Sequence, residues 1–140
     1  MSDRYFLDTN IFIYTFDVRY PEKQEIAKQL ISEGLERNHT SVSWQVIQEF
    51  INASTRKFAE PITLTDCKLY VDTTLAPMWD IYPTRDLIHS ALDLSERWQY
   101  SFYDSLIIAS ALQASCTILY SEDLQHEQTI KSLQIIDPFQ

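Results

Sequence analysis

The stretch Tyr5-Phe6-Leu7-Asp8-Thr9-Asn10-Ile11-Phe12-Ile13-Tyr14 changes character twice within a few residues. Three apolar residues are followed by three polar ones, and then by another mostly apolar run. This pattern predicts a buried strand, a polar turn and the first turns of a helix. Asp8 would then project from the carboxyl end of a strand, which is the edge where open α/β sheets bind their ligands.

Other acidic residues stand at comparable borders between polar and apolar sequence. The strand-like run 117–120 is followed by Ser121 and then by the doublet Glu122-Asp123. Glu49 lies at the edge of the apolar arc of a predicted helix, and Asp104 precedes the apolar segment 106–114. A fold that brings the ends of these apolar segments together would form an acidic metal site. Its expected members are Asp8, Glu49, Asp104 and Asp123.

The rest of the chain alternates between helical and strand-like periods. This alternation predicts one domain over residues 1–140, with a three-layer α/β/α architecture and a central parallel sheet of about five strands. Thr63 and Thr84 are expected to start two helices, and Ser43 to cap another. The expected helices are 22–37, 44–59, 63–76, 84–94 and 106–114, and the further strands are 39–43, 79–82, 116–120 and 133–136.

Composition excludes several classes of protein. Gly34 is the only glycine, so the Walker A loop, the GxGxxG dinucleotide motif and the GxSxG nucleophile elbow cannot be present. The net charge of −9 disfavours binding to an extended nucleic-acid duplex, although a bound cation would reverse the sign locally. Cys67 and Cys116 are far apart in the sequence, and no long apolar run is present. We therefore expect a reduced, cytoplasmic protein that does not enter a membrane.

Each acidic position has a simpler alternative reading. Asp8 could only cap the helix that follows, whereas a ligand role would leave capping to Thr9 or Asn10. Glu49 could face solvent, and Asp104 has the spacing of a capping box with Ser101, which is compatible with a ligand role. Ser121 and the doublet could form a polar turn. Within the doublet we favour Asp123 over Glu122 as the fourth ligand.

The ligand type predicts the chemistry of the site. Carboxylate oxygens without histidine or thiolate favour Mg²⁺ or Mn²⁺ over zinc or copper. Such ions bind phosphate oxygens, activate water and stabilise a leaving oxygen. Hydrolysis of a phosphodiester bond is therefore the expected reaction.

Four segments together resemble the PIN-domain nucleases. They are Leu7-Asp8-Thr9-Asn10-Ile11, Gln48-Glu49-Phe50, Tyr103-Asp104-Ser105-Leu106-Ile107-Ile108-Ala109 and Tyr120-Ser121-Glu122-Asp123-Leu124. In order, spacing and chain length the sequence is most similar to the VapC-type toxins of bacterial toxin–antitoxin pairs.

The resemblance implies an endoribonuclease that depends on Mg²⁺ or Mn²⁺. Its acidic ligand positions match Asp8, Glu49, Asp104 and Asp123, and its supporting polar positions match Thr9 or Asn10, together with Ser121. We expect Glu122 to be a further supporting polar residue. It also implies an RNA substrate, such as a tRNA or a ribosomal RNA loop, and a homodimer. The remaining implied partner is a small antitoxin whose tail blocks the crevice.

Two further points stay open from the sequence. Arg56 and Lys57 follow Glu49 on the same predicted helix and are candidates for contact with phosphate, although they could be ordinary surface charges. A haloacid dehalogenase-like phosphatase is an alternative function, but it requires a second acid at the position of Asn10. A non-catalytic module that binds RNA or protein is the other alternative.

Overall fold

The computed structural model describes residues 3–140. The chain alternates between short strands and helices from one end to the other. Its elements are β1 (Tyr5–Leu7), α1 (Thr9–Tyr14), α2 (Pro21–Arg37), β2 (Thr40–Ser43), α3 (Trp44–Asn52), η1 (Ala53–Lys57), α4 (Leu64–Tyr70), η2 (Val71–Leu75), η3 (Ala76–Met78), β3 (Trp79–Ile81), α5 (Arg85–Trp98), α6 (Phe102–Gln113), β4 (Ile118–Tyr120), β5 (Thr129–Ile130) and β6 (Leu133–Ile136).

The strands form one sheet in the order β3-β2-β1-β4-β6-β5. The five strands from β3 to β6 are parallel, as the sequence predicts, whereas β5 pairs antiparallel with β6. β1 occupies the centre, and Leu7 at its end is in register with Tyr120 at the end of β4. The segments that follow these two strands therefore emerge side by side, at the edge where α/β sheets bind ligands.

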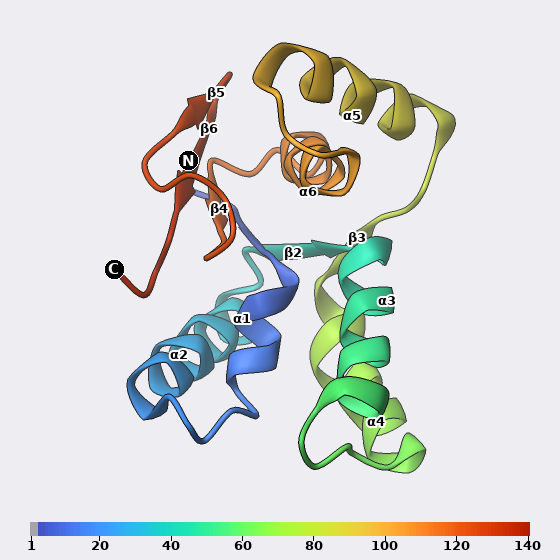
Figure 1. Cartoon of the computed structure of the whole chain (residues 1–140), viewed down its shortest axis with the longest axis vertical. Coiled ribbons are helices and arrows are strands. Elements are labelled where there is room, and N and C mark those ends of the chain that lie inside the picture. The colour runs from blue at the N-terminus through green and yellow to red at the C-terminus, as the bar shows by residue number, and fades with distance from the viewer. Residues whose placement is uncertain (1–2) are drawn as a thin grey trace.

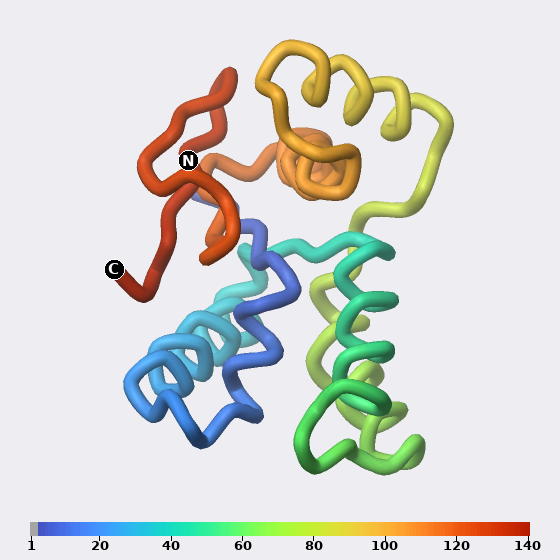
Figure 2. Tube along the Cα trace, in the orientation of Figure 1, coloured from blue at the N-terminus to red at the C-terminus, as the bar shows by residue number. Residues whose placement is uncertain are grey.

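Helices cover both faces of the sheet, which confirms the predicted three-layer architecture. Figure 1 shows α5 and α6 on one side of the sheet and α1, α2, α3 and α4 on the other. The tube in Figure 2 shows the blue N-terminal strand running between the cyan β2 segment and the red C-terminal segments. The core consists of fully buried residues from both layers and the sheet, among them Phe6, Phe12, Phe50, Ile108 and Leu119.

Some local expectations differ from the structure. The helix predicted over 44–59 changes to a π-helical turn at Ala53, and the helix predicted from Thr63 ends in π and 3₁₀ turns before β3. The predicted helix 106–114 already begins at Phe102. Thr63 and Thr84 cap their helices as expected, whereas Ser43 occupies the N-cap position of α3 but makes no capping hydrogen bond with its side chain.

None of the helices within residues 3–140 combines the length and the apolar character that a membrane crossing requires.

Gly34 lets α2 pack closely against β2. A Cβ atom at this position would lie 2.6 Å from Thr40 Oγ1 and 2.9 Å from Thr40 Cβ. Both separations are shorter than packed atoms allow, and Thr40 is itself buried in the sheet. The glycine therefore serves packing between helix and sheet, in addition to weakening the last turn of the helix.

We predict that Gly34→Ala lowers the free energy of unfolding by about 1 to 2 kcal/mol, since overpacking outweighs the better helix propensity of alanine. Urea denaturation measures the change. Gln29→Ala, at an exposed position of the same helix, is the matched control and should not be destabilised. Equal stability of the two variants would show that the sheet accommodates the extra methyl group.

Candidate active site

Asp8 lies directly after β1 and is held by three neighbouring groups. Its backbone N–H donates to the carbonyl of Tyr120 at 3.0 Å. Its carboxylate accepts hydrogen bonds of 2.7 Å from the Ser121 hydroxyl and from the backbone N–H of Thr9. Because β1 and β4 are parallel neighbours, the residues that follow them meet at this point.

The Asp8 carboxyl is almost completely buried, with 7% of the residue exposed. Burial raises the pKa of Asp8 to about 7, because the charged form loses its hydration. The hydrogen bonds from Ser121 and Thr9 act in the opposite direction, and the nearby charges of Glu49 and Asp123 raise the pKa further. Glu49 and Asp123 therefore both lie near enough to Asp8 to act on it electrostatically.

Thr9 and Asn10, which follow Asp8, form hydrogen bonds with Glu49 and Asp123. The Thr9 hydroxyl donates to Glu49 Oε1 at 2.5 Å, and the Asn10 amide donates to Asp123 Oδ2 at 3.0 Å. The expectation that Thr9 or Asn10 caps α1 is wrong, because Asp8 itself is the N-cap and accepts from the Thr9 N–H. This placement leaves both side chains free to reach across to α3 and to the segment after β4.

Glu122 and Asp123 have different environments although they are adjacent in sequence. The Glu122 carboxylate accepts hydrogen bonds of 2.5 Å from the Tyr14 hydroxyl and from Lys23 Nζ. Burial alone would raise its pKa, but the bonds from Lys23 and Tyr14 hold the pKa of Glu122 below its usual value. Asp123 is exposed and is near enough to Asp8 to raise its pKa. The geometry therefore favours Asp123 as the acid that faces the site.

Asp104 lies in the first turn of α6 and is half-buried. Its backbone N–H donates to the Ser101 hydroxyl at 3.2 Å, which confirms the capping contact expected from the sequence. The side chain of Gln45 connects this helix to α3, since its amide donates to the carbonyl of Tyr103 at 3.2 Å and to Glu49 Oε2 at 3.4 Å. The first turn of α6, which carries Asp104, thus lies beside the segment that carries Glu49.

The acidic residues fit a hard cation that keeps part of its hydration shell. Within residues 3–140, no three His, Cys, Asp or Glu side chains lie close enough together to form a complete metal cluster. Mg²⁺ retains several waters and is commonly bound through one or two carboxylates together with substrate phosphates. Asp8, with Glu49 and Asp123 near it, provides such an incomplete oxygen ligand set at a position where burial makes an unpaired charge costly.

The structure also describes the expected phosphate-contacting residues and the residues that hold the acids in place. Arg56 and Lys57 are exposed in the π-helical turn η1, so a contact with phosphate stays a prediction. Gln45, Tyr14 and Lys23 hold site residues in place, and the sequence analysis did not identify them. Their partners are mostly distant in the chain, as with Lys23 and Glu122, which are 99 residues apart. Sequence spacing carries no signal for such contacts.

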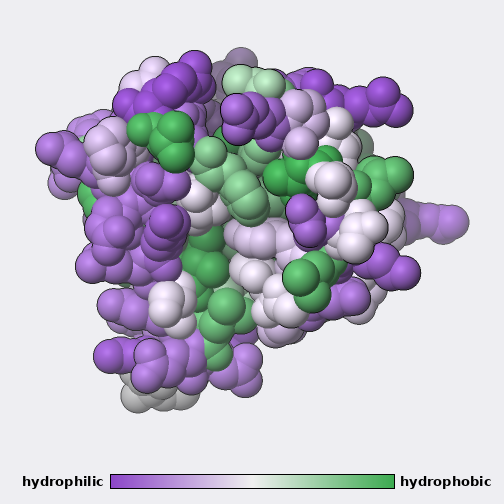
Figure 3. Space-filling model, turned by 90° about the horizontal axis from the view of Figure 1, so that it is seen from below, coloured by the Kyte–Doolittle hydropathy of each residue, from purple (hydrophilic) through white to green (hydrophobic). Residues whose placement is uncertain are grey.

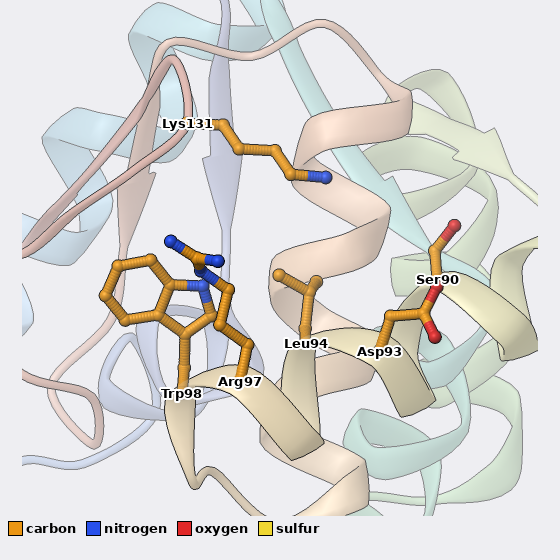
Figure 4. A pocket seen from close by; sticks show the side chains of 6 residues that line it. All are labelled: Ser90, Asp93, Leu94, Arg97, Trp98 and Lys131. Carbon is orange, nitrogen blue, oxygen red and sulfur yellow. The ribbon is translucent and has the colours of Figure 1, made fainter.

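Another pocket lies away from these acidic residues. Its volume is about 440 Å³, and its lining comes from α5 and the β5–β6 turn. Figure 4 shows Leu94, Arg97 and Trp98 on the helix, with Lys131 reaching toward them from the turn. None of the candidate acidic residues Asp8, Glu49, Asp104 and Asp123 lines this pocket.

The chain belongs to the PIN domain family, whose model matches residues 5–131. A search of the curated proteins found no match.

Solved structures share the fold at low sequence identity. A toxin–antitoxin complex from Klebsiella pneumoniae is 16% identical, with a TM-score of 0.66 over 95% of this chain and 96% of the other. Mycobacterium tuberculosis VapC20, described as a sarcin-ricin loop cleaving toxin, is 19% identical, with a TM-score of 0.59 over 85% and 89% of the two chains. FitAB bound to a DNA fragment is 13% identical, with a TM-score of 0.69 over 97% and 96%.

We predict that Asp8 makes the metal-free protein less stable as the pH rises. Its pKa is raised from 3.8 in the unfolded chain to about 7 in the folded one. The stabilising effect of the neutral carboxyl is therefore complete below the unfolded pKa and is lost as the pH rises through the folded pKa.

Denaturation in EDTA measures this effect. From about pH 5 to about pH 8, the free energy of unfolding of the wild type should fall by about 2 kcal/mol relative to that of Asp8→Asn. Asp72→Asn, at an exposed position, should follow the wild type. Parallel pH profiles for the wild type and Asp8→Asn would contradict the raised pKa.

Proposed function

We propose that this protein is a metal-dependent endoribonuclease and the toxin of a type II toxin–antitoxin pair. The observation that carries the proposal is the buried Asp8 carboxylate, which lies between parallel strand ends and is near Glu49 and Asp123, in a PIN domain. A bound cation would compensate the negative charge of a buried carboxylate that has acidic neighbours. The same ligand chemistry suits phosphodiester hydrolysis.

Asp8, Glu49 and Asp123, with Asp104 from α6, are the residues that would hold Mg²⁺ or Mn²⁺. A bound ion would supply Lewis-acid activation of water and stabilisation of the leaving oxygen. The protein supplies orientation, because Ser121 and the Thr9 N–H fix both oxygens of Asp8. Thr9 and Asn10 fix Glu49 and Asp123 in turn.

Proton transfer is available at the exposed acids of the site. Glu49 and Asp123 are both exposed, so either carboxylate can accept a proton from attacking water and exchange it with solvent. Glu122 is a less suitable acceptor, since Lys23 and Tyr14 occupy its oxygens. We assign Glu122 to holding the segment after β4 in place.

A loop or a single strand of nucleic acid fits the charge of the chain better than an extended duplex does, and RNA is the substrate class that we propose. With a net charge of −9, the protein lacks the basic surface for an extended duplex, whereas a loop or a single strand can reach an acidic centre through a bound cation. VapC20 of similar fold is described as cleaving the sarcin-ricin loop, which supports RNA cleavage here. Exposed Arg56 and Lys57 are candidates for contact with the RNA backbone.

An antitoxin protein is the proposed partner, as in the Klebsiella toxin–antitoxin complex of similar fold. The surface offers an apolar area for such contact. Figure 3, the view from below, shows apolar residues gathered in a band next to a strongly hydrophilic region. A pocket of about 380 Å³ between α2 and η2 exposes Phe16 and Leu35. We also propose that the protein forms a homodimer and acts in the cytoplasm.

The alternative functions are less well supported. A phosphatase of the haloacid dehalogenase type needs an acid where this chain has Asn10, and the Asn10 amide donates to Asp123. The chain also belongs to the PIN domain family. A non-catalytic binding module remains the second candidate function, since a family fold can persist without its chemistry.

We predict that the purified protein cuts RNA at discrete positions with Mg²⁺ or Mn²⁺ and does not cut in EDTA. Asp8→Asn and Asp104→Asn should each reduce cleavage by at least about 100-fold, because each removes an oxygen ligand that orients the reacting groups. Sequencing of the new RNA ends measures the cuts. Asp72→Asn, an exposed acid on η2, should cut normally.

Folding of each variant is checked by denaturation, and Asp104→Asn should be at least as stable as the wild type, since it removes one of several like charges. Cleavage that survives EDTA or both substitutions would contradict the proposal. Absence of cleavage in a protein that still binds Mn²⁺ would favour the binding module.

A further inference from the structure

An uncharged pocket of about 170 Å³ lies beside the acidic residues, between α3, α5, α6 and the segment after β3. Its walls are mainly aromatic and aliphatic, and they include Trp44, Tyr82, Ile88 and Tyr103. The Trp44 ring is supported from behind by Trp79, with ring centroids 5.3 Å apart and planes inclined by 23°. Tyr103 is 67% exposed, so its ring is available to a ligand.

Polar atoms in the wall of this pocket lack partners. Within residues 3–140, Ser43 Oγ and Gln45 Oε1 are buried and have no hydrogen-bond partner. Ser105 Oγ, at the start of α6, is also buried without a partner. Ser43 is 2% exposed and Gln45 is 8% exposed. Buried polar groups without partners cost free energy, and nearly all of them in native proteins are satisfied. Both Ser43 and Gln45 line the pocket, so a rotation of either side chain toward the pocket would allow its unpaired atom to bond a ligand there.

The side chain of Gln45 links the pocket to the acidic residues. The other end of the Gln45 amide, Nε2, donates to Glu49 Oε2 at 3.4 Å and to the Tyr103 carbonyl at 3.2 Å. Tyr103 is followed immediately by Asp104. A group that contacts Gln45 and Tyr103 in the pocket would therefore lie near Glu49 and near the first turn of α6, which carries Asp104.

The size and chemistry of the pocket limit what it can hold. At about 170 Å³ it is smaller than typical pockets for whole small molecules, which suits a single planar ring system. Its lining residues are uncharged, so a phosphate would gain nothing there. Aromatic rings with a few polar groups are the usual means of binding an unstacked base of single-stranded RNA.

We infer that this pocket binds one nucleobase of the RNA, unstacked from its neighbours and adjacent to the phosphate that is cut. The Trp44 and Tyr103 rings pack on the base. Gln45 Oε1 accepts a hydrogen bond from an N–H on the base edge, and the Ser43 hydroxyl pairs with a neighbouring edge atom. This inference rests on the proposed nuclease function and identifies Ser43 and Gln45 as determinants of base specificity.

The test is titration of the metal-free protein with adenosine, cytidine, guanosine and uridine, followed by nuclear magnetic resonance. We expect one nucleoside to shift the Gln45 side-chain amide and the Trp44 indole N–H more than the others do. Ser43→Ala should weaken that binding by about tenfold, since a good contact to a base edge is worth that much discrimination. The variant should fold, because it only removes a buried hydroxyl that has no partner.

Ser54→Ala is the matched control, since Ser54 is another fully buried serine that lies outside the pocket, and it should bind like the wild type. Absence of shifts at Gln45 and Trp44 with all four nucleosides would overturn the inference. Shifts of these signals that depend only on protein concentration would also overturn it, because a second copy of the chain would then cover the pocket. Neither result depends on RNA cleavage, so failure of the inference is distinct from failure of the proposed function.

Discussion

Burial of the Asp8 carboxylate is the constraint on which the rest of the site depends. The two parallel strands β1 and β4 end in register, and this brings Asp8 into contact with Ser121. Burial at this position raises the pKa of Asp8 to about 7, so an unpaired negative charge there costs free energy. Two further acids nevertheless lie near it. An arrangement that is unfavourable without a cation becomes favourable with one, and this is the physical basis of the proposed function.

The neighbouring acids Glu122 and Asp123 illustrate how tertiary contacts assign roles to equivalent side chains. Lys23 and Tyr14, from the N-terminal part of the chain, neutralise and orient Glu122. The Asp123 carboxylate accepts a hydrogen bond from the neutral amide of Asn10, the Asp123 backbone N–H donates to the Ser121 hydroxyl, and no cation in residues 3–140 forms an ion pair with Asp123. Tertiary contacts also set the role of Gln45. Its amide N–H donates to Glu49, whereas its amide oxygen has no hydrogen-bond partner within residues 3–140.

Much of the fold could be predicted from local sequence because apolar periodicity and capping residues act over short distances. The parallel strands and most of the helices follow from this periodicity, and Thr63 and Thr84 cap as expected. The antiparallel strand β5 is too short to have a period of its own. The π turns after α3 and α4, and the Ser43 side chain that lines a pocket, depend on packing between distant elements. The acidic positions were visible in the sequence, but the residues that orient them were not.

The most direct test of the central claim is calorimetric titration with Mn²⁺ near neutral pH. If Asp8 is the centre of a cation site, Asp8→Asn should bind Mn²⁺ at least about tenfold more weakly than the wild type. Glu122→Gln should bind almost normally, since Lys23 and Tyr14 already occupy that carboxylate. Equal Mn²⁺ affinity in the wild type and Asp8→Asn would contradict the account, because the buried carboxylate would then have no part in binding the ion.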